Sequence, residues 1–564
     1  MKTPFLCLSL VVPALAQSEF QPIFNGRDLS GWSPVLENAT AGKDPQGLVT
    51  VHDGAIHMYQ NVKAGDLVPF GVIVSDKSYS RYHLRFQYRW MGKKFSPRNN
   101  DIRDAGVIYH AYEFSKVWPK GIEDQVQEGD TGDLIWCDSN GFTWMRPAGQ
   151  YAPEGQGQPG LLPENGGILR EIGFKYEYIG RFPEYDNYEG WTNVDVIAQA
   201  DEWATHKTNG RVRARLRDFK KPDGTPLKEG RITLQMEGAE IQYRNVELKE
   251  LPEPLKPSLE QVALVAGHGA TAEAVVTLTN PGSTPLDASP RVIGKDAEFF
   301  AIEPASANLA AGATAEFRIR FAPAGFGGRC SAAIQFGTEE TGAFVPLNGI
   351  GHGNGTEPTL QEVFDTLAIP VTVGGGRWQD DKPSRLGDSI HARSFISAKD
   401  GKAYLTPLVA FPDDGAALPA LSLFTEVDSA LKPLGVASPA LGVNSAILAK
   451  AQAGTLAPAD FQEIAAPDSA FGLSVGDIAS TNVDRPSNLK LRYKARVFKA
   501  GRLLESKLND AYVVCFETGG VCDYNDAIYL LTNVSAWRIP DSRPQEEKRW
   551  TLKEIRKALQ LPEE

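Results

Sequence analysis

The segment 119–133 carries the side chains with the most evident chemical potential in this chain. Side chains on a β-strand alternate between two faces, so Ile122 and Val126 are predicted to face a core. The opposite face would carry one carboxylate and two amides, from Glu123, Gln125 and Gln127. Such a row suits a sugar, because each hydroxyl of the ligand needs both a donor and an acceptor. The alternative is an ordinary solvated strand face.

A second group of candidates lies just upstream. His110 is predicted to share a strand face with Gly106 and Ile108, where it would act as a base or contact a sugar. Arg103 would supply an anion contact, and Trp118 a stacking platform. A single histidine on a strand also has a simpler role as a hydrogen-bonded structural residue.

The elements that must position these residues are β-strands. Nearly the whole chain consists of short alternating segments separated by Gly, Pro, Asn and Asp, which is typical of all-β sandwiches. Residues 82–90 alternate most regularly. Residues 92–104 and 146–166 form long polar loops, and loops of that length in a compact domain are often functional. The three prolines of residues 251–257 predict a stiff linker after the first domain.

Both ends of this first domain resemble the 3-keto-disaccharide hydrolase family. Residues 20–32 resemble its first strand and turn. Residues 231–249 resemble its closing hairpin, with the pattern G-x-I-x-L-Q-x-E-G-x-x-I-x-(F/Y)-R-N-(V/I). The resemblance covers about residues 17–250 and implies a concanavalin-like jelly roll with a substrate groove on its concave face.

The resemblance also implies roles for single residues. Glu123 and Gln125 match the family's G-(I/V)-E-x-Q segment in the groove. In the segment that matches N-S-G-(I/V), Asp104 and Ala105 replace Asn and Ser, which leaves the role of Asp104 open. A further segment matches H-x-x-N-G and ends in a predicted hairpin turn. The substrate-binding candidates from these segments are Asp104, Tyr109, His206 and Lys207.

The substrate that the resemblance implies is an oxidised oligosaccharide or glycoside with a ketone at C3. That ketone acidifies the C2 proton, so the glycosidic bond can break by elimination through an enolate, followed by addition of water. One base and one acid suffice, and a cation or divalent metal near the C3 oxygen stabilises the enolate. We assign Glu123 or His110 as the base, and Arg103 or a metal in the groove as the electrophile.

Two other functions compete with this one. A laminarinase-like glycoside hydrolase needs two carboxylates about 5–5.5 Å apart for retention. Glu123 and Glu128 are five residues apart, which puts them on opposite strand faces unless a bulge intervenes. The other rival is a non-catalytic protein that binds glycans or adheres to a cell wall or surface glycan, because lectins share this fold.

The rest of the chain is predicted to hold two further β domains and a tail. Residues 258–352 resemble immunoglobulin-like modules of the abnormal-spindle and hydin type, which implies a spacer or a contact module. Residues 357–540 are predicted to form a C-terminal β-sandwich, and residues 541–564 a charged helical tail. In the C-terminal domain, four side chains could bind Ca²⁺; the alternative is that Asp523 and Asn525 simply form a turn. The four are Glu517, Asp523, Asn525 and Asp526.

The N-terminus indicates export. Residues 1–16 have a basic start, a short apolar run and Ala-Leu-Ala before Gln17, as in a secretory signal peptide. A secreted location permits a disulfide between Cys515 and Cys522 and, in a eukaryote, N-glycans. The sequons begin at Asn38, Asn354 and Asn533.

Composition excludes several classes of partner. The net charge of −12 argues against a nucleic-acid binder. After the signal peptide, no segment approaches the roughly 18 apolar residues of a membrane helix. No G-x-G-x-x-G follows a strand, so no dinucleotide cofactor is expected.

Overall fold

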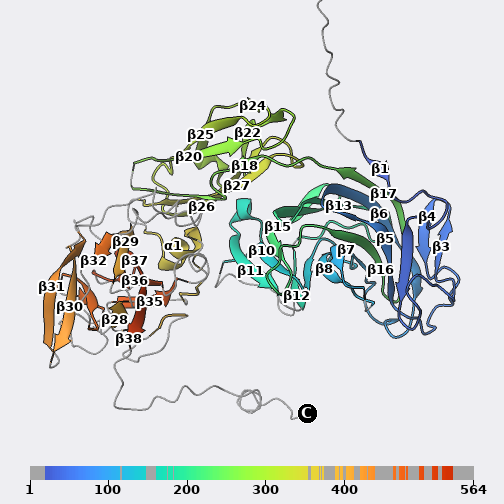
Figure 1. The fold of residues 1–564 in the computed structure, drawn as a ribbon, viewed down its shortest axis with the longest axis horizontal. Helices are drawn as coiled ribbons and strands as arrows, with labels where there is room; N and C mark the ends of the chain where they lie inside the picture. Colours follow the sequence, from blue (N-terminus) through green and yellow to red (C-terminus); the bar gives the residue numbers. More distant parts are fainter. Residues whose placement is uncertain are drawn as a thin grey trace, which may run out of the picture. The chain divides into compact units, whose positions relative to one another are not determined.

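The computed structural model shows a chain built almost entirely of β-strands (Figure 1). It forms two compact units, residues 1–370 with 445–455 and residues 371–444 with 456–564. The described residues are 19–114, 117–147, 160–173, 176–181, 183–267, 269–353, 357–367, 369, 371–373, 388–390, 392, 394–397, 402–411, 420–427, 430–438, 462–464, 469–476, 478–480, 495–500, 511–518 and 524–537. The predicted signal peptide, helical tail, Asn354, Cys522 and Asp523 lie outside them.

The first domain is a sandwich of two antiparallel sheets. The ten-stranded sheet has the order β11-β10-β15-β14-β13-β6-β17-β4-β3, with β1 beside β17. Its strands are β1 (Gln21–Pro22), β3 (Val49–His52), β4 (Ala55–Met58), β6 (Arg81–Lys94), β10 (Asn140–Met145), β11 (Ile168–Gly173), β13 (Thr192–Gln199), β14 (Trp203–Thr208), β15 (Arg211–Lys220) and β17 (Ala239–Glu250). A 3-10 turn, Pro163–Asn165, precedes β11.

The seven-stranded sheet has the order β12-β9-β8-β7-β16-β5-β2. Its strands are β2 (Trp32–Leu36), β5 (Gly71–Tyr79), β7 (Gly106–Tyr112), β8 (Lys120–Gln125), β9 (Leu134–Cys137), β12 (Tyr176–Ile179) and β16 (Gly230–Met236). Both sheets are curved, and the seven-stranded sheet is the inner layer (Figure 1). This confirms the predicted concanavalin-like jelly roll.

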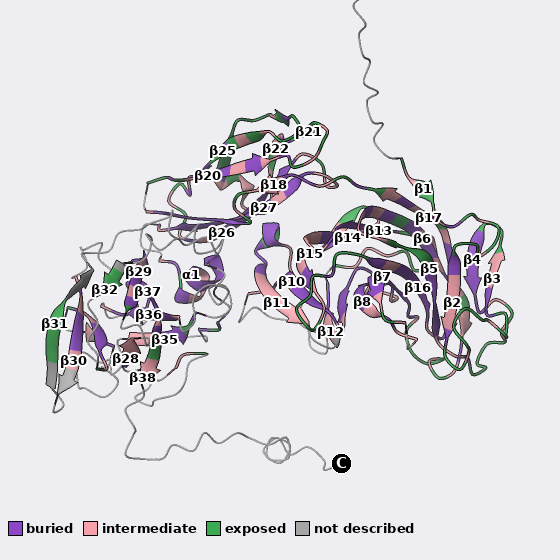
Figure 2. Cartoon of the chain, viewed as in Figure 1, coloured by how far each residue is buried: buried purple, intermediate pink, exposed green. Residues whose placement is uncertain are grey.

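The core of the jelly roll lies between the two sheets. Alternation directs Tyr82, Leu84, Phe86, Tyr88 and Trp90 of β6 into it, where each is at most 4% exposed. From the other sheet, β16 contributes Ile232, Leu234 and Met236. Burial of this apolar area at about 25 cal/mol per Å² is the main favourable term in folding the domain. Buried residues accordingly concentrate on the strands (Figure 2).

An immunoglobulin-like sandwich follows. One of its sheets contains β18 (Lys256–Pro257), β20 (Ala272–Thr279), β23 (Phe300–Glu303) and β25 (Thr314–Phe321). The other contains β19 (Val262–Ala266), β22 (Pro290–Ile293), β26 (Gly328–Phe336) and β27 (Ala343–Gly351). Short elements complete it: β21 (Leu286–Asp287), β24 (Asn308–Leu309) and a 3-10 turn, Ala297–Phe299.

A short amphipathic helix, α1 (Leu360–Thr366), follows the immunoglobulin-like module. A capping box starts it, because the side chain of Thr359 accepts from the backbone of Glu362 while the Glu362 side chain accepts from the backbone of Thr359. Val363 and Phe364 are fully buried. The helix contacts β26 and β27, and it belongs to the first compact unit. Among the described residues, no helix is both long and apolar enough to cross a membrane.

The second unit is a β-sandwich of its own. Its five-stranded sheet comprises β29 (Ala403–Val409), β32 (Gln462–Ile464), β35 (Ala495–Lys499), β36 (Tyr512–Phe516) and β37 (Ala527–Thr532). A four-stranded sheet comprises β30 (Leu421–Val427), β31 (Ala430–Ser438), β33 (Gly472–Val475) and β34 (Ile478–Ala479), while β28 (Ser394–Ser397) pairs with β38 (Val534–Trp537). These sheets share one hydrophobic core, so the predicted C-terminal sandwich is confirmed.

Within the first unit, ion pairs join the jelly roll to the immunoglobulin-like module. Glu340 of the module accepts from Lys249 (Nζ–Oε2, 2.7 Å) and pairs with His83 (Nδ1–Oε1, 2.8 Å). The other nitrogen of His83 lies 2.9 Å from Asp195. The hydrogen bond from His83 lowers the pKa of Glu340 to about 2. Burial opposes the charged form of His83, but its bonds to Asp195 and Glu340 raise its pKa overall.

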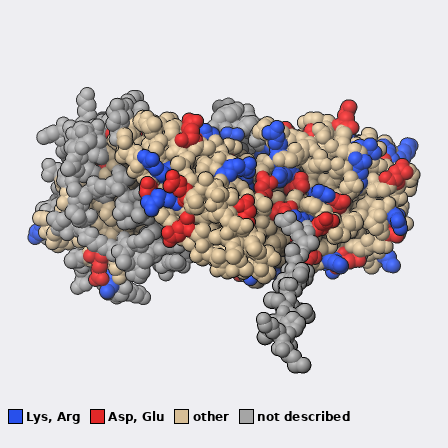
Figure 3. Space-filling view, turned by 90° about the horizontal axis from the view of Figure 1, so that it is seen from above, with Lys and Arg blue, Asp and Glu red and all other residues tan. Residues whose placement is uncertain are grey.

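The charged side chains on the surface are mixed in sign. On the face shown in Figure 3, Lys and Arg alternate with Asp and Glu without a large area of one sign. The net charge of −12 is therefore not expressed there as a single acidic surface.

We predict that Glu340→Ala weakens the attachment of the module. Charged hydrogen bonds contribute about 1.5–3 kcal/mol each when partly buried, so the free energy of unfolding of the first unit should fall by about that amount. Ionised Glu340 adds to the free energy of unfolding above the ordinary glutamate pKa of 4.5. Protonated His83 adds to it below the ordinary histidine pKa of 6.5. The loss should therefore be largest between these pH values. Thermal unfolding across pH measures it.

Glu316→Ala is the matched control, because Glu316 is an exposed acid on β25 of the same module. It should leave unfolding nearly unchanged. An equal effect of the two substitutions would contradict the structural role of Glu340.

Candidate functional site

Glu123 lies on the face of the seven-stranded sheet that points away from the core between the two sheets. Its neighbours Ile122 and Val126 are fully buried in the core between the sheets. Alternation turns Glu123 and Gln125 to the other face, where each is only 5% exposed. A carboxylate on the concave side of the jelly roll and shielded from water is the first feature of the site.

Residues of the neighbouring strands hold the Glu123 carboxylate. Gln235 of β16 donates to its Oε1 (2.8 Å), and the Cys137 thiol at the end of β9 donates to its Oε2 (3.4 Å). Gly106 of β7 lies beneath it. A Cβ at Gly106 would stand 2.2 Å from Glu123 Oε1, so any side chain there would displace the carboxylate.

Two more acids and a guanidinium lie beside Glu123. Asp104 is two residues before Gly106, and Glu237 is two residues after Gln235, so both continue the same strand faces. Arg98 Nη1 lies 2.7 Å from Asp104 Oδ2 and also pairs with Glu237. Gln127 donates a further hydrogen bond to Asp104. The three adjacent strands β8, β7 and β16 and their ends thus bring three carboxylates close together, two of which pair with Arg98.

Burial and mutual repulsion change the proton affinities of these acids. Burial, followed by the charge of Asp104, raises the pKa of Glu123 to about 7. Burial and the charges of Asp104 and Glu123 raise the pKa of Glu237 well above its ordinary value. Burial also raises the pKa of Asp104, against the effect of Arg98. Acids whose pKa values are raised by burial and by one another are candidates for proton transfer near neutral pH.

Aromatic rings border the acids. The rings of Trp118 and Phe70 lie 6.2 Å apart, tilted by 38°. Phe70 in turn lies beside Gly238, because a Cβ at Gly238 would be 3.4 Å from the Phe70 ring. Trp118 therefore belongs to the same region as Glu237. Apolar ring faces next to a few convergent polar groups are typical of small-molecule sites.

His110 is not on the groove face, so its predicted role as a base is wrong. The register of β7 against β8 shifts between Tyr109 and Tyr112, and His110 has a left-handed backbone (φ 49°). This bulge turns its side chain into the core, where it is 0% exposed. Its Nε2 donates to the carbonyl of Ala200 (2.9 Å), which leaves Nδ1 to accept from the Tyr82 hydroxyl (3.1 Å). Burial lowers the pKa of His110 to about 4.

Tyr109 and His206 are also buried between the sheets and do not contact the groove as predicted. The Tyr109 hydroxyl lies 2.9 Å from His206 Nε2, and His206 Nδ1 lies 3.5 Å from Asp124 Oδ1. Burial lowers the pKa of His206 to about 3 and raises that of Asp124 well above its ordinary value. Lys207 points away from the groove and pairs with Glu339 of the immunoglobulin-like module (2.6 Å).

Arg103 is not the cation beside Glu123. Its guanidinium binds both oxygens of Glu128 (2.9 and 2.8 Å) and lies over the ring of Trp90. Arg98, which the sequence analysis did not single out, is the arginine that pairs with Asp104 and Glu237. Glu128 is occupied by Arg103, so it does not form a carboxylate pair with Glu123.

Sequence reasoning missed Arg98, Gln235, Glu237 and Cys137. A signal for two of them was present. Gln235 and Glu237 are the L-Q-x-E-G letters of the closing hairpin pattern, and they are polar positions on a strand whose alternate residues are apolar. Arg98 lies in a long loop and Cys137 at a strand end, where no periodicity marks them.

The C-terminal candidates are only partly described. Glu517, Asn525 and Asp526 are fully buried. Asp526 accepts from the Thr518 side chain (2.8 Å), and Glu517 accepts from the backbone of Tyr524 (3.2 Å). Among the described residues, no three His, Cys, Asp or Glu side chains are grouped to hold a metal ion. Calcium binding, for which Asp523 was also proposed, stays a prediction, as does a metal in the groove.

The remaining modification sites give a mixed result. Cys515 is a free, fully buried cysteine in the structure, so the predicted disulfide with Cys522 is not present there. Asn38 is exposed on a turn with φ 62°. Asn533 is partly buried and donates to the carbonyl of Lys402 (2.8 Å). Glycosylation at these sequons stays a prediction.

Comparison with known proteins supports a carbohydrate-related first domain. Residues 19–249 match the family model described as a 3-keto-alpha-glucoside-1,2-lyase-like domain. This match spans less than half of the 564 residues. No curated protein matches the chain significantly.

Solved structures with some likeness are distant. A protein provisionally described as a glycosyl hydrolase, from Parabacteroides distasonis, is 16% identical over 41% of this chain and 100% of its own, with a TM-score of 0.25. The carbohydrate-binding module CBM66 from Bacillus subtilis is 12% identical over 39% of this chain and 96% of its own (TM-score 0.23). A PapD-like domain of human CEP192 is 19% identical over 18% of this chain and 88% of its own (TM-score 0.14). These low scores support no argument about function.

We predict that Glu123→Gln stabilises the protein at alkaline pH. Between the ordinary pKa of 4.5 and about 7, the folded state keeps a proton on Glu123 that the unfolded state loses. The free energy of unfolding therefore falls as pH rises through this window, by at most about 3 kcal/mol at about 1.36 kcal/mol per pKa unit. An amide in its place removes the effect. Thermal unfolding of both proteins at pH 4 and pH 8 measures it.

Glu128→Gln is the control of opposite sign. The hydrogen bond from Arg103 lowers the pKa of Glu128, so its substitution should destabilise the protein near neutral pH. A stability difference for Glu123→Gln that does not change with pH would show that the pKa of Glu123 is the same in the folded and unfolded states.

Proposed function

We propose that the jelly-roll domain cleaves 3-keto-glycosides by proton abstraction at C2, elimination of the aglycone and addition of water. The observation that carries this proposal is the buried Glu123, with a pKa of about 7, next to further acids with raised pKa values and one arginine. The match of residues 19–249 to the 3-keto-alpha-glucoside-1,2-lyase-like family is consistent with it.

Glu123 serves as the base in this proposal. Its ionised carboxylate removes the C2 proton, and the electron pair moves toward the C3 ketone to form an enolate. A base with a pKa near the working pH combines sufficient ionisation with sufficient proton affinity. The hydrogen bonds from Gln235 and Cys137 fix the direction of the carboxylate oxygens.

Arg98 and its acidic partners stabilise the enolate and protonate the leaving oxygen in this proposal. Its guanidinium, held by Asp104 and Glu237, provides a positive charge for the developing enolate. Burial and the neighbouring acids raise the pKa of Glu237 well above its ordinary value, so Glu237 is the acid that this proposal assigns to the leaving oxygen. The C1–O bond then breaks, and water adds to the C1=C2 bond to give the free 3-keto sugar. Trp118 and Phe70 provide ring faces for the sugar.

The test is turnover of 3-keto-trehalose or a 3-keto-glucoside by the purified protein. We predict that Glu123→Gln lowers kcat/KM by about 10²–10⁴, the usual contribution of a general base. In the wild type, kcat/KM should rise with pH through about 7 as Glu123 loses its proton. The rates are obtained by measuring the release of 3-keto-glucose by chromatography, with and without chelator.

Glu128→Gln is the matched control and should retain most activity. Normal turnover by a folded Glu123→Gln protein would exclude Glu123 as the base. Tight binding of the substrate by the wild type without release of product would instead support the glycan-binding alternative.

A second pair of variants tests which arginine takes part. Arg98→Ala should lower kcat more than it changes KM, because the enolate charge develops only in the transition state. Arg98→Lys should recover part of kcat, since it keeps the charge. Arg103→Ala removes a partner of Glu128 and should leave kcat within a few-fold of wild type. The reverse order of effects would return the role to Arg103.

A further inference from the structure

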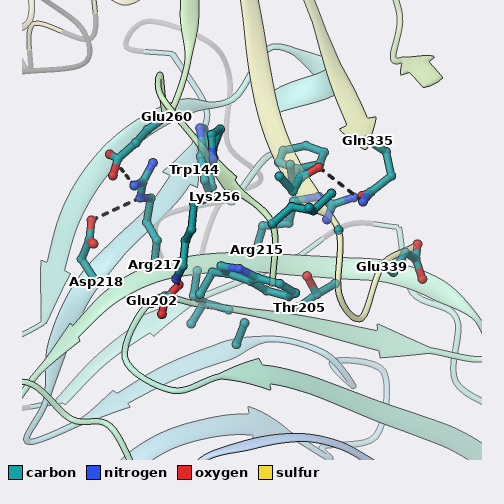
Figure 4. A pocket seen from close by; sticks show the side chains of 18 residues that line it. Trp144, Glu202, Thr205, Arg215, Arg217, Asp218, Lys256, Glu260, Gln335 and Glu339 are labelled. Atoms are coloured by element: carbon teal, nitrogen blue, oxygen red, sulfur yellow. Dashed lines mark hydrogen bonds and ion pairs between the residues drawn. The ribbon is translucent and has the colours of Figure 1, made fainter. Parts of the chain in front are cut away.

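A cavity of about 320 Å³ lies against the ten-stranded sheet, on the side of the jelly roll opposite to Glu123. Figure 4 shows the residues that line it. Its floor is formed by β10, β14 and β15 of the ten-stranded sheet, and its other side by β18 and the β26–β27 region of the immunoglobulin-like module. All of these strands belong to the first compact unit. The volume is at the lower end of the range for small-molecule sites, about 300–1,000 Å³.

Aromatic side chains line both sides of the cavity. Trp144 and Trp203 come from the jelly roll, and Phe344 from the module. Trp203 is cross-strand neighbour to Arg217, and Thr205 to Arg215, so these four side chains share the outward face of the sheet. The guanidinium carbon of Arg215 lies 3.8 Å from the centre of the Phe344 ring.

The charged residues of the lining are largely matched with one another. Arg217 pairs with Asp218 (3.2 Å) and with Glu260, and Lys256 pairs with Glu202. Glu339 pairs with Lys207 from outside the lining (2.6 Å). The cavity therefore has no excess positive charge to attract a phosphate or sulfate, and a neutral ligand fits it better.

Polar groups are also available inside the cavity. The guanidinium of Arg215 belongs to a residue of the lining, its Nη2 is 3.4 Å from Glu164, and its N–H groups are hydrogen-bond donors. Thr205 adds a hydroxyl that can donate or accept. Indole rings together with mixed donors and acceptors match the apolar faces and hydroxyl edges of a sugar.

We propose that this cavity is a second carbohydrate site, which binds a neutral saccharide unit with Trp203 as the main stacking surface. It lies on the outer face of the ten-stranded sheet, whereas Glu123 lies on the outer face of the other sheet. The two sites are on opposite sides of the sandwich, so binding here does not depend on the proposed catalytic function.

The test is titration of the full chain with D-glucose, trehalose, maltotriose, cellotriose and laminaritriose. Binding is measured by calorimetry and by tryptophan fluorescence. At least one of these sugars should bind. Trp203→Ala should weaken its affinity at least about tenfold, as expected for an aromatic anchor. Glu123→Gln should leave the affinity unchanged. Phe344→Leu, on the opposite wall of the cavity, should also weaken binding. It serves as the test variant if the Trp203→Ala protein does not fold.

Trp191→Ala is the matched control. Trp191 belongs to the same domain but is stacked against Arg244 (3.8 Å) and Arg89 (4.6 Å), outside the cavity. It should bind the sugar as the wild type does. Two outcomes would overturn the proposal: no binding of any of these sugars at millimolar concentration, or binding that Glu123→Gln abolishes and Trp203→Ala does not.

Discussion

The close approach of the Glu123 carboxylate to the backbone of Gly106 is the constraint on which the candidate site depends. Only glycine leaves room for the acid at that point, because a Cβ would stand 2.2 Å from its oxygen. The carboxylate can therefore lie flat on the sheet, between Gln235 on one side and Cys137 on the other. This position removes water from the acid and raises its pKa. It also brings the acid near Asp104, which lies two residues before Gly106 in the sequence.

The bulge at His110 has the opposite consequence for its own side chain. One residue with a left-handed backbone turns an expected groove residue into the core. There, His110, Tyr82, Tyr109 and His206 form hydrogen bonds within the interior of the sandwich. Buried polar groups that are hydrogen-bonded make one packing arrangement more favourable than its competitors, so these histidines contribute to structure. Their lowered pKa values keep them neutral and compatible with burial.

The immunoglobulin-like module is more than a spacer attached by a linker. Glu340 reaches two bases of the jelly roll, and Lys207 is bound to the adjacent Glu339. These partly buried contacts set the module against the outer face of the ten-stranded sheet. The two surfaces do not close completely, and the aromatic cavity lies where they separate. A ligand in that cavity would contact both domains and would add to the interactions that join them.

The sequence by itself determined the all-β class and the strand faces with regular alternation. It placed Ile122 and Val126 in the core and Glu123 and Gln125 opposite them, because period-two alternation is a local property of an extended chain. It could not show the bulge, because no local sequence pattern predicts a left-handed backbone conformation at His110. Only the tertiary structure decided which acids lie near Glu123 and which arginine pairs with those acids. Arg98, Asp104 and Glu237 are brought together by pairing between strands far apart in sequence, and that pairing depends on the packing of the whole sandwich.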